Sequence, residues 1–113
     1  MADIQAKLRF LPLSAHKVRL VIDTVRGKDV VEAIEMLRFI PKRASGPVRK
    51  LLASAVSNAE ENLGISRDDL YIAKIYADEA PTRRWRRFGA RGRFKPILRR
   101  TSHVTVVLRE RGS

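Results

Sequence analysis

The sequence contains no cysteine, only two histidines and no apolar run long enough to cross a bilayer. Without thiols, disulfide frameworks, thiolate zinc sites and thiol catalysis are excluded. The two histidines, His16 and His103, have no companions at metal-binding spacing, so we expect neither a metal nor another cofactor. The N-terminus carries no signal-peptide pattern. We therefore expect a soluble, intracellular protein that has no membrane partner.

Catalytic patterns are missing as well. The sequence has no glycine-rich phosphate loop, no nucleophile elbow and no HExxH pattern. Three pairs of adjacent carboxylates occur, at Glu60-Glu61, Asp68-Asp69 and Asp78-Glu79. Adjacent residues do not share a face of a helix or a strand. These pairs are therefore poorly placed for acid–base chemistry, and we expect no enzyme.

Acidic residues are absent from one long stretch, Arg83–Arg100, which holds nine of the 24 basic residues. The whole chain has a net charge of +12, yet the rest of it is nearly balanced, with fifteen basic and twelve acidic residues. Large apolar residues interrupt the cationic stretch: Trp85, Phe88, Phe94, Ile97 and Leu98. Because a packed core cannot hold this density of unpaired charge, we expect the stretch to face a polyanion.

Alternation at the N-terminus predicts a strand. Over residues 4–12 the apolar side chains of Ala6, Leu8 and Phe10 fall on one side and basic side chains fall on the other. A period of two is typical of a half-buried strand. We therefore expect all three apolar side chains to face the core.

Two short helices are expected to follow this strand. Ser14 is a residue type that caps helix N-termini, and apolar spacing continues the first helix to about Val25, before Gly27. Asp29 and Glu32 have the spacing of a capping box, which predicts a second helix after them. This second helix is expected to bury Val30, Ile34 and Leu37.

A third helix is predicted from about Pro41 to Gly64, where apolar residues recur at three- and four-residue spacing. Gly46 and Pro47 interrupt this pattern, because proline lacks a backbone donor and clashes with the preceding turn. Either the helix is kinked at this point or it begins near Pro47. Of the two alternatives, we favour the kink.

The remaining regular segments complete an α+β fold. Residues 70–77 are rich in β-branched and aromatic residues, and residues 102–108 alternate, so both are predicted to be strands. The order of elements predicts three helices packed on a small antiparallel sheet. With 44% apolar residues, the chain is expected to form a single domain over residues 1–113.

The cationic stretch is predicted to form a long protruding β-hairpin, residues 78–102. Gly89, Gly92 and Pro96 disfavour a helix, and the flanking strands exclude a terminal tail. An arm that continues unbroken from residue 78 to Phe88 would reach roughly 35 Å and would project from the domain. A two-stranded ribbon is marginally stable in water, so we expect a partner to supply packing and negative charge.

Nucleic acid is the favoured partner, because arginines neutralise phosphates while aromatic rings stack on unpaired bases. A solvated loop would not need the interleaved aromatic residues. A membrane-bound helix would need a continuous apolar face, which glycine and lysine interrupt. Two further clusters are equally consistent with a solvated helix face and with RNA contact: Lys17, Arg19, Arg26 and Lys28, and then Lys42, Arg43, Arg49 and Lys50.

Several blocks of the sequence resemble bacterial large-subunit ribosomal protein 22. They are SAHKVRLVIDTVRGK at Ser14–Lys28, SAVSNAEEN at Ser54–Asn62, YADEAPTRR, and ARGR with ILRRTSHVTVVL within Ala90–Leu108. The resemblance implies an α+β domain near the exit of the nascent-peptide tunnel. It also implies that the hairpin threads through large-subunit rRNA of the 23S type, and that the hairpin tip forms part of the tunnel wall.

By resemblance, the chain would be a structural constituent that supports assembly, contacts other large-subunit proteins and the nascent polypeptide, and forms no homo-oligomer. The implied rRNA-binding residues are Lys17, Arg19, Arg26, Lys28, Arg83, Arg84, Arg86, Arg87, Arg91, Arg93, Lys95, Arg99, Arg100, Thr101, Ser102 and His103. The implied tunnel-facing tip comprises Trp85, Arg86, Arg87, Phe88, Gly89, Ala90 and Arg91. At Phe88-Gly89 the family commonly has proline and arginine. The alternative function is a free-standing nucleic-acid-binding regulator.

Overall fold

The computed structural model describes residues 3–80, 83–88 and 94–111. It confirms the α+β fold, with three helices, a three-stranded antiparallel sheet and a separate two-stranded antiparallel sheet. In chain order the elements are β1 (Asp3–Leu11), α1 (Ala15–Ile22), α2 (Val30–Arg38), α3 (Ser45–Leu63), a 3₁₀ turn (Arg67–Asp69), β2 (Leu70–Glu79), β3 (Arg83–Phe88), β4 (Phe94–Arg99) and β5 (Ser102–Glu110).

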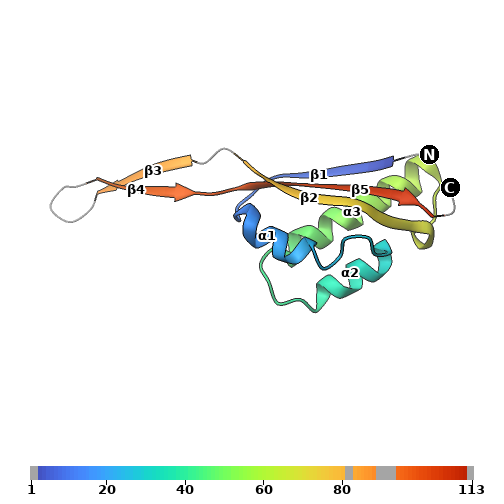
Figure 1. The fold of residues 1–113 in the computed structure, drawn as a ribbon. Coiled ribbons are helices and arrows are strands. Elements are labelled where there is room, and N and C mark those ends of the chain that lie inside the picture. The colour runs from blue at the N-terminus through green and yellow to red at the C-terminus, as the bar shows by residue number, and fades with distance from the viewer. Residues whose placement is uncertain (1–2, 81–82, 89–93, 112–113) are drawn as a thin grey trace.

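Strand β5 lies in the middle of the three-stranded sheet, antiparallel to β1 on one side and to β2 on the other. Val106 stands opposite Ala6 of β1 and Ile75 of β2. All three helices lie on the same side of this sheet (Figure 1). The predicted alternation of β5 is confirmed, because Val104, Val106 and Leu108 are fully buried.

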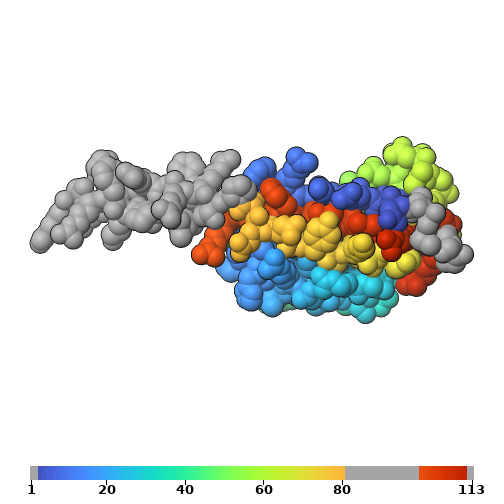
Figure 2. Space-filling model, turned by 45° about the horizontal axis from the view of Figure 1, so that its top comes forward, coloured from blue at the N-terminus to red at the C-terminus, as the bar shows by residue number. Residues whose placement is uncertain are grey.

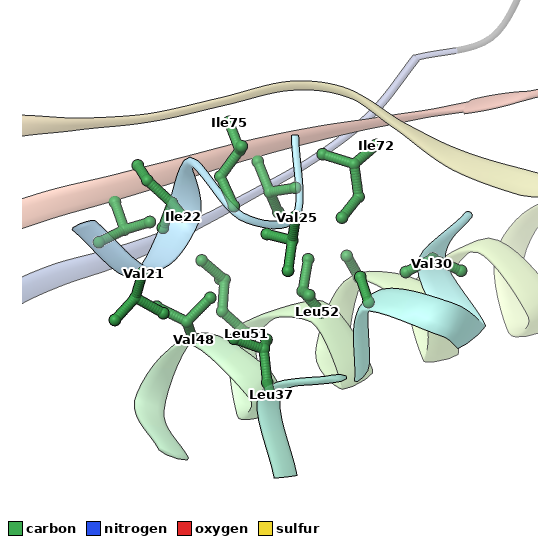
Figure 3. Packing of buried hydrophobic residues seen from close by; sticks show 14 of the residues in the cluster. Val21, Ile22, Val25, Val30, Leu37, Val48, Leu51, Leu52, Ile72 and Ile75 are labelled. Atoms are coloured by element: carbon green, nitrogen blue, oxygen red, sulfur yellow. The ribbon is translucent and has the colours of Figure 1, made fainter. Parts of the chain in front are cut away.

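The core fills the space between this face of the sheet and the helices. In Figure 3, Ile72 and Ile75 point from β2 toward the helices, and Leu51 and Leu52 of α3 point back. Burying an aliphatic side chain of this size contributes about 1.5–3 kcal/mol relative to leaving it in water. Helices as short as α1 and α2 are marginal alone, so their stability comes from this packing. Fully buried residues include Val18, Ile22, Val25, Val30, Val48, Leu52, Ile72 and Leu108.

Helix α1 begins as predicted, at the residue after Ser14, whose side-chain oxygen accepts a hydrogen bond from the Lys17 backbone N–H. It ends at Ile22, three residues earlier than expected. The Thr24 and Val25 N–H groups donate to carbonyls only three residues back, so the chain tightens into turns in which Val25 is still buried. Gly27 then takes a positive φ of 79°, which suits glycine.

The capping box predicted for α2 is not formed. Asp29 is the residue before the helix, but its side chain makes no capping hydrogen bond. Its carboxylate instead accepts a hydrogen bond from the guanidinium of Arg111, which is distant in sequence. Val30 and Leu37 are buried as predicted, and Ile34 packs partly buried against the core.

The kink favoured for the third helix is wrong, and the alternative of a later start is correct. Helix α3 begins at Ser45, so Gly46 and Pro47 fall in its first turn. Proline is tolerated there because the first four N–H groups of a helix have no acceptor within the helix. At the other end Gly64 takes a left-handed conformation, φ 65° and ψ 22°, and ends the helix as predicted.

The prediction for β1 is wrong at Phe10. Ala6 and Leu8 pack against the core, but the pairing of β1 with β5 shifts register between Leu8 and Leu11. Phe10 has a φ of 56° and is 52% exposed, while Leu11 is buried in its place. A β-bulge adds a residue to one strand and redirects the side chains beyond it. The period-two alternation therefore fails at the bulge.

Strands β3 and β4 pair with one another and form the separate two-stranded sheet. In Figure 1 this ribbon lies beyond the end of the three-stranded sheet, away from the helices. The molecule accordingly measures 64 × 26 × 18 Å. The connecting residues 89–93, where the turn and part of the tip were predicted, lie outside the described residues.

The single arm expected from residue 78 to Phe88 is divided into two strands. Strand β2 ends at Glu79, and β3 begins at Arg83. Between them, the Ala80 backbone N–H donates to the Thr101 carbonyl at 3.0 Å, so the two chains stay paired next to the break. The ribbon is thus tied to the domain by backbone hydrogen bonding as well as by chain continuity.

Replacement by alanine should have opposite effects on stability at Gly46, in the first turn of α3, and at Gly64, which follows its last residue. A Cβ at either Gly46 or Gly64 would meet no atom within 4 Å. Gly46→Ala should raise the free energy of unfolding by about 0.5–1 kcal/mol, because alanine favours the helix and restricts the unfolded chain. Gly64→Ala should lower it by about 1 kcal/mol, because alanine is strained at positive φ. Urea unfolding of both variants measures this, and equal signs would contradict it.

Candidate nucleic-acid interface

The register of the hairpin places cationic residues opposite one another. Arg83 pairs with Arg99, and Arg87 pairs with Lys95. Like charges at directly opposed positions destabilise a ribbon, and a two-stranded ribbon has little packing to offset this. An anionic partner with closely spaced charges would relieve the repulsion, and a nucleic-acid backbone carries such charges.

A groove lies where the hairpin joins the domain, between the end of β2, the link from β4 to β5, the N-terminal end of α1 and the segment before α3. Lys17, Arg43 and Arg100 are exposed at this groove, and His16 accompanies them. The acid at the groove is Glu79, so positive charge dominates. The lining residues are Pro12, Leu13, Ser14, His16, Lys17, Arg43, Glu79 and Arg100. We call this the junction groove; it adjoins the most cationic part of the sequence.

The ion pairs of the described residues do not involve the basic residues of the junction groove. They are Arg26–Asp23, Arg38–Glu35, Arg67–Glu60, Arg109–Asp3 and Arg111–Asp29. Hydrogen bonds from Arg109 and Arg67 lower the pKa of the Asp3 and Glu60 carboxyl groups, respectively. These pairs are largely exposed, and exposed pairs contribute little to stability. Because these five ion pairs lie outside the junction groove, they do not neutralise the basic residues of the groove, which can contact an external anion.

Arg19 and Arg26 have a structural role that spacing alone did not predict. The Arg19 Nε and Nη2 atoms donate to the Ala77 carbonyl at 3.2 and 2.8 Å, and Arg26 Nη2 donates to the Ile75 carbonyl at 2.8 Å. Both carbonyls belong to β2, which is an edge strand. An edge strand left open offers unpaired backbone groups to other chains. The two arginines therefore cover the free edge of β2.

Backbone hydrogen bonds of Gly27 and Lys28 cover a further part of the β2 edge. The Ile72 N–H donates to the Lys28 carbonyl at 2.9 Å, and the Gly27 N–H donates to the Ile72 carbonyl at 3.1 Å. Lys28 is partly exposed. Of the four basic residues predicted in this part of the chain, only Lys17 lines the junction groove.

The three residues that follow Arg100 differ in their accessibility. Thr101 and His103 are partly exposed, and the His103 Nδ1 atom accepts a hydrogen bond from the Phe10 backbone N–H at 3.1 Å. Ser102 is completely buried, and its hydroxyl has no hydrogen-bond partner among the described atoms. Its side chain faces the core with Val104. The contact of Ser102 with rRNA stays a prediction.

The predicted tip residues fall into two groups. Trp85, Arg86, Arg87 and Phe88 belong to β3, where each has a paired residue on β4. Residues 89–93, which include Gly89, Ala90, Arg91 and Arg93, lie outside the described residues. The described pairing of β3 with β4 extends as far as Phe88 and Phe94.

The second basic cluster is divided between two surfaces. Lys42 and Arg43 border a hollow that also includes Lys17 and adjoins the junction groove. Arg49 and Lys50 line another hollow between α2 and α3. The prediction of rRNA contacts omitted Arg43, because its approach to Lys17 depends on the packing of distant segments and leaves no local signal in the sequence.

The described residues include neither a metal-binding cluster nor a membrane-spanning helix. They contain no group of three or more histidine, cysteine, aspartate or glutamate residues positioned to hold a metal ion. None of their helices combines the length and the hydropathy that a membrane span requires.

Comparison with known proteins identifies the family. A family model described as ribosomal protein L22p/L17e matches residues 6–109. The chain belongs to this family. The large ribosomal subunit protein uL22 of Thermoanaerobacter sp. (strain X514) is 50% identical over 109 residues, which cover 96% of this chain and 98% of the relative.

Other L22p/L17e relatives are similarly close. The uL22 protein of Caldicellulosiruptor saccharolyticus is 52% identical over 106 residues, covering 94% of this chain and 87% of the relative. That of Pediococcus pentosaceus is 47% identical over 111 residues, covering 98% and 94%. The resemblance found in the sequence blocks is therefore confirmed, and the hairpin lies within the region that the family model matches.

Alanine substitutions of Arg19 and Lys17, both on α1, should affect different properties: the first should lower stability and the second should weaken RNA binding. Arg19→Ala should lower the free energy of unfolding by about 1–2 kcal/mol, because the Ala77 carbonyl loses a charged donor. Lys17→Ala should leave stability within about 0.5 kcal/mol and should reduce the slope of log RNA affinity against log salt by about 1. Chemical unfolding and salt titration of RNA binding measure the two effects. The interpretation fails if only the Arg19 variant changes the slope.

Proposed function

We propose that this chain is a structural constituent of the large ribosomal subunit that binds large-subunit rRNA through the hairpin and the junction groove. The observation that carries the proposal is the segregation of charge. An acid-free cationic stretch lies on a ribbon beyond the core, while the ion pairs described above use basic residues outside the junction groove. The relatives named large ribosomal subunit protein uL22 support the assignment.

The mechanism is electrostatic and steric. Each phosphate that a lysine or arginine neutralises releases condensed counterions, which drives association and makes it sensitive to salt. Along β3, Arg83 and Arg87 occupy positions of one face of the ribbon, and Arg84 and Arg86 occupy positions of the other, so the ribbon can contact RNA segments on both faces. By neutralising the repulsion between such segments, the chain supports subunit assembly. The hairpin tip forms part of the wall of the nascent-peptide tunnel and limits its width.

The partners follow from this position. They are 23S-type rRNA, neighbouring proteins of the large subunit and the nascent polypeptide in transit. The chain acts as a single copy in the cytoplasm, without a membrane partner and without catalysis. A free-standing regulator would instead require selective affinity for a small isolated nucleic acid, whereas contacts to phosphates carry little sequence information.

Sedimentation tests the assignment to the subunit. A tagged chain produced in bacterial cells should sediment with large subunits at low salt. A variant in which Arg83, Arg84 and Arg86 are changed to glutamine should dissociate at lower salt, because it releases fewer counterions. Wild-type protein that stays at the top of the gradient at low salt would overturn the proposal.

A control variant removes the same charge elsewhere. Lys7, Arg67 and Lys74 are exposed, lie outside both the hairpin and the junction groove, and belong to neither of the two further basic clusters. Changing these three residues to glutamine should leave sedimentation close to wild type. If the control and the hairpin variant dissociate at the same salt concentration, net charge alone explains binding and the hairpin has no special role.

Cross-linking tests the tunnel position. Because the chain has no cysteine, Ala90→Cys introduces its only thiol, and a thiol-attached photo-cross-linker then reports on the tip. In ribosomes stalled during translation, this probe should cross-link to the nascent polypeptide. Ser57→Cys, at an exposed position of α3, should give no such product. Cross-links to rRNA alone from the Ala90 variant would contradict the tunnel assignment while leaving rRNA binding intact.

A further inference from the structure

We propose that Phe10 and His103 form a platform at the base of the hairpin on which an unpaired RNA base stacks. The inference rests on the proposed rRNA binding and adds a contact of another physical kind. The hairpin and the junction groove would bind phosphates by charge, whereas this platform would bind a base by its aromatic face. Phe10 belongs to neither the hairpin nor the junction groove.

The first observation is that Phe10 is strained and solvent-exposed at the same time. Among the described residues, Phe10 is the one non-glycine residue with a positive φ, 56°. The residue is 52% exposed, although phenylalanine is normally buried. Backbone strain of this kind persists only where surrounding contacts enforce it, and such sites cluster where ligands bind.

The core does not require Phe10 to take this conformation. Leu11, the next residue, is 6% exposed and supplies the apolar side chain at the end of β1. Glycine or asparagine at position 10 would adopt the positive φ with less strain. The strained backbone therefore presents an aromatic ring to solvent without any gain in core packing from that ring.

The second observation is that contacts with His103 fix the ring in place. The Phe10 backbone N–H donates to the His103 Nδ1 atom at 3.1 Å. The two ring centroids lie 4.6 Å apart at an interplanar angle of 85°, an edge-to-face arrangement. Edge-to-face aromatic pairs are favourable, and a ring held in one orientation loses little freedom when a ligand stacks on it.

The hydrogen bond from the Phe10 N–H also determines which nitrogen of the His103 imidazole can donate. Because Nδ1 accepts, a neutral His103 carries its hydrogen on Nε2. No hydrogen bond within the described residues uses Nε2. The platform thus combines an exposed aromatic ring with a hydrogen-bond donor, and single-stranded RNA offers both stacking faces and acceptor atoms.

Charge around the platform favours an anionic ligand that carries a base. Arg9 and Arg100 are exposed and lie close to the two rings in sequence. Asp78 stands opposite His103 on β2 and is the acid nearest to the platform in the strand register. Backbone phosphates beside the stacked base would meet the arginines. Because a duplex hides its base faces, the occupant is an unpaired base.

Substitution of Phe10 in the full chain tests the proposal. Phe10→Leu keeps an apolar side chain and removes the ring, so the affinity for a short labelled oligoadenylate should fall about 5-fold or more. The affinity for an RNA duplex and the salt slope should not change, because stacking releases no counterions. Phe10→Asn should lose the same affinity without strain at positive φ, and thermal unfolding confirms that both variants fold.

A fluorescent reporter provides a second measurement. Phe10→Trp in a Trp85→Phe background leaves one indole, at the platform. Oligoadenylate should quench its emission at saturation, whereas the duplex should not. Leu63→Trp in the same background is the control, because position 63 is also exposed but lies at the end of α3. Its emission should not respond to either RNA.

The outcomes separate the two proposals. If labelled RNA binds the wild type but the Phe10 variants bind it equally well and the indole stays silent, the stacking platform is disproved and rRNA binding stands. If the wild type binds no RNA at any salt concentration, the proposed function itself fails. If Phe10→Leu binds RNA normally but enters large subunits poorly, a neighbouring protein covers the ring, and the stacking proposal is overturned.

Discussion

The pairing of β5 with both β1 and β2 is the interaction on which the rest of the structure depends. This central strand buries Val104, Val106 and Leu108 against the helices and joins the two ends of the chain in one sheet. It also follows β4 directly, so the ribbon continues from the most buried part of the sheet. Figure 2 shows β1, β5 and β2 side by side at the surface, on the face without helices.

Charge is organised around this framework. Arg19 of α1 and Arg26 of the turns that follow it cover the free edge of β2, where carbonyl groups would otherwise lack partners. Acidic residues pair with arginines elsewhere, and none of these ion pairs of the described residues uses a basic residue of the junction groove. Similar basic residues therefore have different roles, some structural and some available to RNA. The place of each basic residue in the fold decides its role, whereas its residue type does not.

Backbone strain and solvent exposure coincide at the end of β1. The bulge at Phe10 breaks a regular alternation and places an aromatic ring beside His103. A bulge at a sheet edge commonly re-aims a side chain, and here it does so next to the hairpin. The same local irregularity explains both the incorrect prediction for Phe10 and the candidate platform. Departures from the regular pattern are expected where binding sites conflict with packing.

Local pattern by itself determined the α+β class, the cap at Ser14, the end of α3 at Gly64 and the strand that carries Val106, because these features depend on neighbours in sequence. The acid-free stretch likewise indicated a polyanionic partner. Only the tertiary structure decided that Asp29 binds Arg111, that Arg43 approaches Lys17 and that Ser102 is buried. Each of these contacts joins residues brought together by packing, and residues so far apart leave no periodic signal in the chain.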